Sequence, residues 1–228
     1  MKQTSHHPLA TTERRAAKGF TLIEMMVVVA MIALIVAAMA PQVFSTLVST
    51  RLTSAGESLS GQISLARQMA ISGNHSVEVR FYQYEDPEAP GSESAYKAIA
   101  IMRASSSGGA AAPGENLRQL TDTFYLPSGI VLGSAPELSP LLASGTIPTQ
   151  VDSERIIKRS PTARYKAFLL RSDGSTNLEQ LMGSGFNPNM AYLTLGEERA
   201  LEGAKSIPSN FFAVQIDPST GRTTTYRP

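Results

Sequence analysis

The longest hydrophobic stretch of the chain lies near the amino terminus. Residues 25–39 are all apolar, and Glu24 is the only ionisable side chain between Lys18 and Arg51. A helix of about 20 apolar residues, rising about 1.5 Å per residue, matches the roughly 30 Å hydrocarbon core of a bilayer. The pattern therefore predicts a transmembrane helix over residues 20–44.

A second pattern continues beyond this run. Apolar side chains recur at steps of three and four, which is typical of an amphipathic helix. We therefore expect one helix over residues 20–72 that stops at Gly73 and Asn74. A kink is expected at Pro41, because proline removes a backbone hydrogen bond and crowds the preceding turn. The apolar positions are Val48, Leu52, Ala55, Leu59, Ile63, Ala66 and Ala70.

Helix propensity alone does not hold the second half of this helix together. Gly56 and Gly61 each cost roughly 1 kcal/mol relative to alanine, so the apolar stripe must pack against a sheet. The charged residues of this half, Arg51, Glu57 and Arg67, are expected to form a solvated face. The alternative is that they form salt bridges between subunits.

After residue 74 the pattern changes to the alternation that is typical of β-strands. Residues 76–84 and 96–102 predict a hairpin. Residues 85–94 and 104–116 are rich in Pro, Gly and Ser and predict loops, and residues 134–153 are interpreted as an insertion. The first strand places Val77, Val79 and Phe81 on one face and Glu78, Arg80 and Tyr82 on the other. Further strands are expected at 123–126, 129–132, 163–171, 191–195, 211–216 and 222–226, the last two joined by a turn at 217–221.

A helix followed by strands indicates the α+β class. The expected fold is a long amino-terminal helix, transmembrane in its first half and amphipathic in its second, packed on an antiparallel β-sheet. The chain of 228 residues is expected to divide into a basic leader at 1–19, a membrane and assembly helix at 20–44, its amphipathic continuation at 45–73 and an exported β-rich domain at 74–228.

Charge is distributed unevenly along the chain. Residues 1–19 carry four basic side chains and one acidic one, a net charge of +3, so the chain total of +1 leaves −2 for the remainder. Basic residues before an apolar helix keep that end in the cytoplasm, which places the domain outside the inner membrane. The chain has no cysteine, so its fold depends on a hydrophobic core and not on disulfides.

The start of the apolar run has an unusual order of residues. In Gly19-Phe20-Thr21-Leu22-Ile23-Glu24 the small residue precedes the apolar segment, whereas a secretory signal peptide has its cleavage site after that segment. A carboxylate within the bilayer costs about 2.5 to 3.5 kcal/mol, so Glu24 requires a cationic partner. The alternative is an ordinary helix-start acid at the headgroup level.

These six residues resemble the processing motif of type IV prepilins and type II secretion pseudopilins. The resemblance implies that a prepilin peptidase cleaves between Gly19 and Phe20 and methylates the new amino group of Phe20. It also implies that Glu24 pairs with that amine on a neighbouring subunit during assembly. Pro41 matches a proline that is common in the apolar helix of the family.

Shorter segments resemble narrower groups within the family. Four short segments and Phe168 resemble the H-type minor pseudopilins; the segments are residues 66–71, 126–130, 173–175 and 221–222. The carboxyl end, at 211–218 and 226–228, resembles the prepilin-like Verru_Chthon cassette protein D family. Many pilins have a carboxyl-terminal disulfide loop, and its absence favours a pseudopilin or a minor subunit.

Residues suited to catalysis are sparse. His75 is the only histidine after the leader, and without cysteine the chain cannot assemble a Cys/His nucleophile or a typical zinc site. The acidic residues at 85–88 and Asp217 lack the spacing of a calcium loop, and residues 183–185 lack the lysine of a phosphate-binding loop. We therefore expect no enzyme activity, no metal site and no cofactor.

A group of basic residues allows a second function. Arg222 and Arg227 flank the last predicted strand, and six further residues lie in the middle of the domain: Arg155, Lys158, Arg159, Arg164, Lys166 and Arg171. Such side chains can contact DNA phosphates. An ordinary exposed strand face is favoured, because the chain after the leader is net acidic and has few aromatic residues nearby.

The sequence thus predicts a prepilin-like structural subunit of the inner membrane, processed and N-methylated, that joins other subunits in a type IV pilus or a type II secretion pseudopilus. Its long loops and low aromatic content favour a minor component. The alternative is a minor pilin that binds DNA for uptake through its carboxyl-terminal domain. An exported enzyme anchored by the helix is the least favoured reading.

Overall fold

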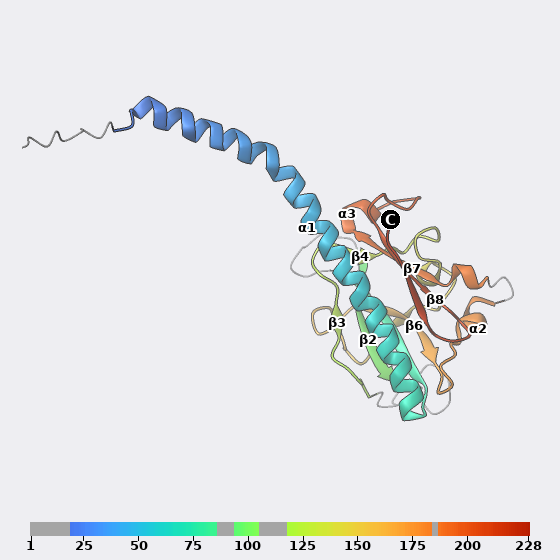
Figure 1. Ribbon diagram of the computed structural model, residues 1–228. Helices are drawn as coiled ribbons and strands as arrows, with labels where there is room; N and C mark the ends of the chain where they lie inside the picture. Colours follow the sequence, from blue (N-terminus) through green and yellow to red (C-terminus); the bar gives the residue numbers. More distant parts are fainter. Residues whose placement is uncertain (1–18, 86–93, 105–117, 184–186) are drawn as a thin grey trace, which may run out of the picture. The chain divides into compact units, whose positions relative to one another are not determined.

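One long helix, α1 (Leu22–Gly73), runs from the amino-terminal region into the globular domain (Figure 1). The computed structural model describes residues 19–85, 94–104, 118–183 and 187–228, without the side chains of 38–45. The chain divides into two compact units, Met1–Ser45 and Thr46–Pro228. The kink at Pro41 concerns a side chain outside the described set and stays a prediction. No helix in the described ranges is both long enough and apolar enough to cross a membrane.

The second half of α1 packs as its periodicity predicts. Leu52, Leu59 and Ile63 are fully buried, as are the alanines of the stripe, while Val48 is half-buried. Gly56 is required by this packing, because a Cβ atom there would lie 2.2 Å from the ring of Phe212. The helix ends at the predicted position, Gly73, where Asn74 takes a left-handed conformation with φ of 47°.

The domain is built on a nine-stranded sheet in which every named pairing is antiparallel. The spatial order is β5-β6-β1-β2-β4-β7-β8-β9, with β3 paired to β2. The strands are β1 (Val77–Tyr84), β2 (Ala95–Arg103), β3 (Phe124–Tyr125), β4 (Ile130–Leu132), β5 (Gln150–Val151), β6 (Arg164–Leu170), β7 (Tyr192–Glu197), β8 (Phe212–Ile216) and β9 (Thr223–Tyr226). The α+β class and the antiparallel sheet are as predicted.

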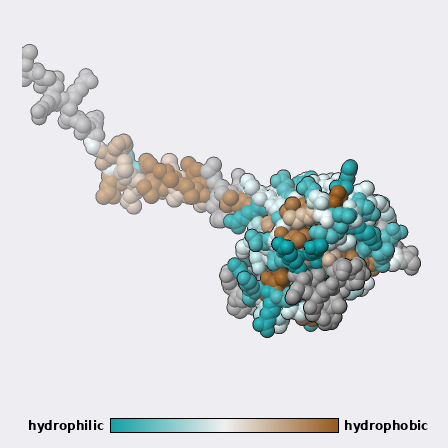
Figure 2. Space-filling model, turned by 90° about the horizontal axis from the view of Figure 1, so that it is seen from below, coloured by the Kyte–Doolittle hydropathy of each residue, from teal (hydrophilic) through white to brown (hydrophobic). Residues whose placement is uncertain are grey.

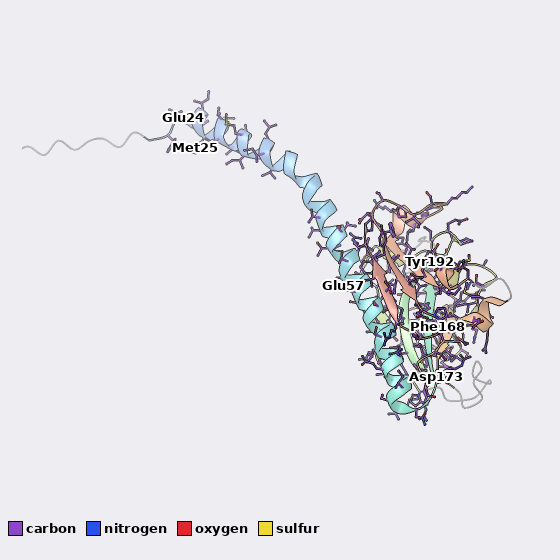
Figure 3. The ribbon with its side chains drawn as sticks, turned by 45° about the vertical axis from the view of Figure 1, so that its right-hand side comes forward. Glu24, Met25, Glu57, Phe168, Asp173 and Tyr192 are labelled. Atoms are coloured by element: carbon purple, nitrogen blue, oxygen red, sulfur yellow. The ribbon has the colours of Figure 1, made fainter. Side chains whose placement is uncertain are left out.

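Both faces of the central strands are buried. One face meets α1 across a large apolar core that includes Val79, Phe81 and Phe168, which is labelled in Figure 3. The other face forms a second cluster of Tyr82, Tyr84, Ala98, Ala100, Met102, Ile157, Ala163 and Tyr165. Residues 152–163 cover this second face, so the polar residues that alternate along β1 do not meet solvent.

The segment interpreted as an insertion, 134–153, is part of the fold. It contains a short 3-10 helix, η1 (Pro140–Leu142), and the edge strand β5, and it buries Leu138, Leu141 and Leu142. The buried Ser139 hydroxyl accepts a hydrogen bond from the backbone nitrogen of Thr194 at 2.9 Å. The prediction missed this packing because the apolar residues follow no regular period between the prolines and serines.

Among the described residues, short helical elements also form at α2 (Leu178–Met182), η3 (Pro188–Met190) and α3 (Glu198–Leu201). The turn between β8 and β9 forms as predicted, with the Asp217 carboxylate accepting from Ser219 and Gly221 adopting φ of 65°. This hairpin is attached to α1 by polar contacts. The Arg67 Nε donates to the Thr220 carbonyl at 2.6 Å, so Arg67, which was expected on a solvated face, is half-buried and bound to this hairpin.

Candidate functional site

The predicted cleavage point lies in irregular chain immediately before α1. Gly19, Phe20 and Thr21 have no regular secondary structure. A Cβ atom at Gly19 would have no neighbour within 4 Å, and Phe20 is 76% exposed. The bond between Gly19 and Phe20 is therefore sterically accessible. Cleavage at this bond and methylation of Phe20 stay predictions.

Glu24 closes the first turn of α1 in a capping box with Thr21. One carboxylate oxygen of Glu24 accepts hydrogen bonds from the Thr21 backbone nitrogen at 2.9 Å and from its hydroxyl at 3.0 Å. The Thr21 hydroxyl in turn accepts from the Glu24 backbone nitrogen at 3.3 Å. This reciprocal pattern satisfies polar groups that the first turn of a helix leaves without partners. Glu24 is thus held at the helix start, next to the predicted new amino terminus.

The helix that follows Glu24 exposes a large apolar surface (Figure 2). Figure 3 labels Glu24 and Met25 at its start. A groove of about 300 Å³ lies beside the carboxylate and is lined by Phe20, Ile23, Glu24, Val27 and Val28. Large apolar side chains between 46% and 78% exposed include Leu22, Met26, Val29, Ile32, Leu34 and Val36. Exposed apolar surface of this extent marks interaction sites with proteins or membranes.

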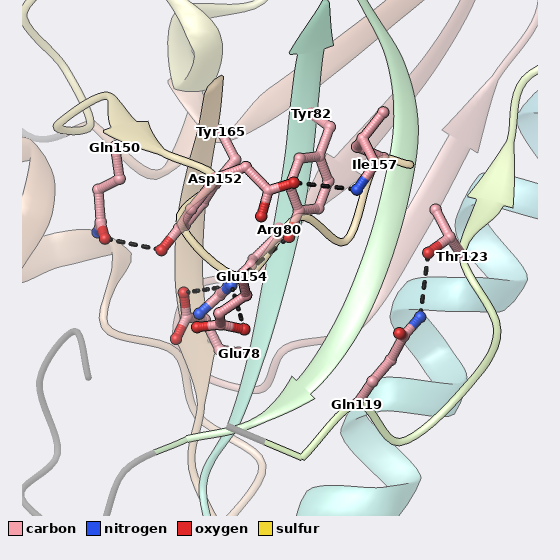
Figure 4. A network of polar contacts seen from close by, with 10 residues as sticks. All are labelled: Glu78, Arg80, Tyr82, Gln119, Thr123, Gln150, Asp152, Glu154, Ile157 and Tyr165. Carbon is pink, nitrogen blue, oxygen red and sulfur yellow. Dashed lines mark hydrogen bonds and ion pairs between the residues drawn. The ribbon is translucent and has the colours of Figure 1, made fainter. Parts of the chain in front are cut away.

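Sequence reasoning missed a buried ionic cluster on the second face of the sheet (Figure 4). Arg80, 1% exposed, pairs through Nε with Glu78 at 2.9 Å and through Nη1 with Glu154 at 3.4 Å. Its guanidinium lies 4.3 Å from the ring centre of Tyr165. The facing residues of β2 are small, since Arg80 and Tyr82 pair with Ala100 and Ala98, and this leaves room for the large polar side chains.

Burial and neighbouring polar groups together set the ionisation of this cluster. Burial acts against the charged guanidinium of Arg80, but the Glu78 carboxylate and the Tyr82 hydroxyl outweigh that effect and raise the pKa of Arg80. Burial raises the pKa of Tyr165 to about 12 and also raises that of Tyr82. Arg80 is therefore permanently charged, and the tyrosines keep their protons at ordinary pH.

The cluster is better suited to structure than to catalysis. Its ionic groups bind one another, and Glu154 comes from the segment that covers the sheet, so the pair with Arg80 fixes this segment on β1. Small residues opposite an arginine were the available sequence signal. That signal depends on strand pairing, which the sequence pattern did not give at single-residue register.

The structure separates the predicted basic residues into different environments. Arg227 donates from Nη2 to the Ser49 hydroxyl at 2.6 Å and to Asn210 Oδ1 at 2.9 Å, and from Nη1 to the Phe211 carbonyl at 3.0 Å. Lys166 is 3% exposed and donates to the carbonyls of Leu142 and Ala143. The inclusion of Lys166 in an exposed strand face is wrong, because the amine caps the end of η1 inside the core.

The other basic residues are more accessible. Arg222, Arg155, Lys158, Arg159 and Arg164 are exposed, and Arg159 lies over the ring of Tyr125 at 5.5 Å. Arg171 donates to the Thr176 carbonyl and to Gln180 Oε1. DNA binding through Arg222 and Arg227 stays a prediction, with the Arg227 guanidinium already occupied within the domain.

The remaining candidates carry no assembled site. His75 is half-buried beside the end of α1, and its Nδ1 lies 3.3 Å from the Ser76 carbonyl oxygen. Glu85 is exposed, and the acidic residues at 86–88 lie outside the described ranges. Where side chains are described, no group of three or more His, Asp or Glu residues is arranged to hold a metal ion.

Residues 14–40 match a family model described as the prokaryotic N-terminal methylation motif. Together with α1 and the capped Glu24, this match defines the class: a protein with a prepilin-type amino terminus in front of an α+β domain. The match covers the amino-terminal motif alone, and it supports the resemblance of this segment to type IV prepilins and type II secretion pseudopilins. No curated protein matches it significantly in sequence.

Solved structures with a similar chain trace include two minor subunits. The type IV minor pilin FimU of Pseudomonas aeruginosa is 13% identical, with 78% of this chain and 89% of that chain covered and a TM-score of 0.39. The minor pseudopilin EpsH of the type 2 secretion system of Vibrio cholerae is 11% identical, with 78% and 98% covered and a TM-score of 0.38.

Proposed function

We propose that this chain is a structural subunit of a type IV pilus or a type II secretion pseudopilus. A prepilin peptidase cleaves it between Gly19 and Phe20 and methylates the Phe20 amine. The apolar first half of α1 then packs against the corresponding helices of other subunits. In this role the only chemistry is the processing that the chain receives.

The arrangement around Glu24 carries the proposal. A carboxylate at the start of an exposed apolar helix is costly to bury unless a cation meets it. Cleavage creates such a cation four residues earlier, at Phe20. In a single chain the carboxylate is already engaged by Thr21, so the amine of a neighbouring subunit is the partner that assembly would add.

The proposed location follows from charge and hydropathy. Before assembly, residues 20–44 are held in the inner membrane with the leader in the cytoplasm, because basic residues before an apolar segment favour that orientation. The β-rich domain is periplasmic in this orientation. Incorporation then moves the domain into an extracytoplasmic filament.

The first test is processing. The full chain is co-expressed with a prepilin peptidase, and its amino terminus is examined by mass spectrometry. The expected product begins at Phe20 and carries one added methyl group. An intact chain, or cleavage at another bond, would contradict the proposal.

The second test separates processing from assembly. Glu24→Ala should be cleaved nearly as well as the wild type, because the scissile bond is unchanged, while its incorporation into sheared filaments should fall at least about tenfold. Glu179→Ala, an exposed carboxylate on α2, is the control and should assemble normally. Equal incorporation of the Glu24 variant would remove the charge-pairing role.

A further inference from the structure

A cavity of about 370 Å³ lies where β2, the turn between β3 and β4 and the start of α3 come together. Its size is that of a small-molecule site. The pairing of β1 with β2 passes over Lys97, which is the extra residue of a β-bulge. A bulge redirects a side chain out of the regular alternation of a strand. The Lys97 side chain thus lines this cavity, and its amine pairs with Glu198 Oε1 at 2.9 Å.

Backbone hydrogen bonds hold the rim of the cavity in place. The Leu126 nitrogen donates to the Lys97 carbonyl at 2.9 Å, and the Glu198 nitrogen donates to the Gly129 carbonyl at 2.9 Å. Gly129 has φ of 80°, which a residue with a side chain rarely adopts. The turn between β3 and β4 is therefore attached to β2 on one side and to the start of α3 on the other. The cavity is thus formed in advance of any ligand.

One wall of the cavity is an aromatic platform. The Tyr125 residue is 38% exposed, and the Arg159 guanidinium lies 5.5 Å from the centre of its ring. Arg159 belongs to residues 152–163, which the pair between Arg80 and Glu154 fixes on β1. The buried ionic cluster therefore also positions a group of this cavity. A flat ring with guanidinium donors beside it offers a ligand both an apolar face and hydrogen bonds.

The polar lining of the cavity includes both signs of charge. Its charged residues are Lys97, Arg159, Arg199, Glu197 and Glu198. Across the described ranges, neither Glu197 nor Arg199 has a side-chain hydrogen bond or ion pair. A simple anion would meet the carboxylates, a simple cation would meet the basic groups, and an apolar ligand would leave charged groups without partners. Sugar hydroxyls both donate and accept hydrogen bonds, so a saccharide matches this lining better than an ion or an apolar molecule.

We propose that this cavity binds a saccharide, with the C–H face of one sugar ring on Tyr125 and its hydroxyls hydrogen-bonded to Glu197 and Arg199. The inference goes beyond the role of a structural subunit, because in that role only the first half of α1 binds other subunits. It gives the β-rich domain a task of its own. A subunit in a filament would present a carbohydrate-binding site outside the membrane.

Titration of the full chain tests this site. The protein is purified in an amine-oxide detergent, which has no sugar headgroup, and binding of maltotriose, cellotriose, tri-N-acetylchitotriose and trigalacturonate is followed by ligand-observed NMR. At least one of these should bind with a Kd of about 5 mM or tighter. Tyr125→Ala should weaken that binding at least about tenfold and Arg199→Ala at least about fivefold, because the platform and a charged donor are lost. The controls Tyr226→Ala and Arg222→Ala, at exposed residues of the same types, should bind within about twofold of the wild type.

The outcomes separate this inference from the proposed function. If no trisaccharide binds at about 10 mM, or if Tyr125→Ala and Arg199→Ala bind like the wild type, the saccharide site is wrong. Binding of sulfate or spermidine but of no saccharide would identify an ion site and equally contradict it. Circular dichroism checks the fold of each variant, and Arg199→Ala, at an exposed residue, decides the case if Tyr125→Ala unfolds. The peptidase does not enter this measurement, so an uncleaved chain that binds sugar would overturn the proposed function alone.

Discussion

Arg80 shows how single residues decide what this domain tolerates. It lies in the middle of β1, almost completely buried, with one carboxylate from its own strand and one from the covering segment. A buried ion pair adds little stability compared with well-packed apolar residues, but removing one partner leaves an uncompensated charge. The cluster therefore specifies where residues 152–163 sit more than it stabilises the fold.

This asymmetry gives a prediction for the domain, residues 46–228. Arg80→Met should lower the free energy of unfolding by about 3 to 5 kcal/mol, because it leaves the Glu78 carboxylate buried without its partner. Glu154→Gln should cost less than about 1 kcal/mol, because this partner is partly solvated. Combining Arg80→Met with Glu78→Leu should recover much of the loss. Urea denaturation followed by circular dichroism measures all three, and equal costs for the two single variants would contradict the argument.

The buried tyrosines predict a loss of stability in alkali. Burial raises the pKa of Tyr165 and of Tyr96 to about 12, from 10.0 in the unfolded chain. The unfolded chain therefore releases these protons first, so the stabilisation is complete below pH 10 and is lost as the pH rises towards 12. The free energy of unfolding should fall between pH 10 and pH 12.

Burial lowers the pKa of Lys166, so its contribution to the pH dependence of stability has the opposite sign. Variants are therefore needed to isolate the contribution of the tyrosines. Tyr165→Phe should make the fall between pH 10 and pH 12 shallower. Tyr226→Phe, at a residue that is 61% exposed, should leave the slope of the wild type. Identical slopes in the two variants would show that Tyr165 does not titrate with unfolding.

At the scale of elements, the two glycines of α1 should respond in opposite ways to the same substitution. Gly56→Ala should destabilise the domain by about 1 to 3 kcal/mol, because its Cβ atom would overlap the Phe212 ring and force it to move. Gly61→Ala should stabilise it by about 0.5 to 1 kcal/mol, because alanine favours the helix and its Cβ atom meets nothing. Thermal unfolding of residues 46–228 compares them directly, and a shift of the same sign in both would be evidence against this account.

Elements with a regular period were predictable from the sequence. The stripe from Leu52 to Ala70 gave the buried face of α1, and the segments around β1, β2, β6 and β8 showed the strand alternation. Elements defined by tertiary contacts were not. β5 has two residues and η1 has three. Each is held by groups distant in sequence. For example, the Lys166 amine donates a hydrogen bond to the Leu142 carbonyl.

The candidate site divides in the same way. Gly19, Phe20 and Glu24 stand out because glycine and glutamate are adjacent to a long apolar run. This local order is visible in the sequence alone. The capping contact between Thr21 and Glu24 follows from their three-residue spacing. The Arg80 cluster required the register of β1 with β2 and β6, and a segment more than 70 residues away to supply Glu154.

At the scale of the whole molecule, the chain consists of two units, one with an exposed apolar helix and one with a buried core. Thr46–Pro228 carries its own core and sheet, while residues 20–37 expose apolar side chains that a single copy does not cover. Changes in the amino-terminal unit are therefore expected to alter association, and changes in the domain core to alter unfolding. Contacts between the last strand and the helix join the two ends of this domain.

Variants of Arg227 and Arg222 test the DNA-binding alternative directly. Arg227 links the carboxyl end to Ser49 and Asn210, so Arg227→Ala should lower the free energy of unfolding by about 1 to 3 kcal/mol, because these half-buried acceptors lose a charged donor. Arg222→Ala, at an exposed residue, should leave stability within about 0.5 kcal/mol. If the domain binds DNA, Arg222→Ala should weaken a low-salt gel shift while the fold is intact, since a phosphate contact contributes independently of packing. If the domain gives no gel shift at low salt, the DNA-binding role is ruled out. The role of Arg227 is then purely structural.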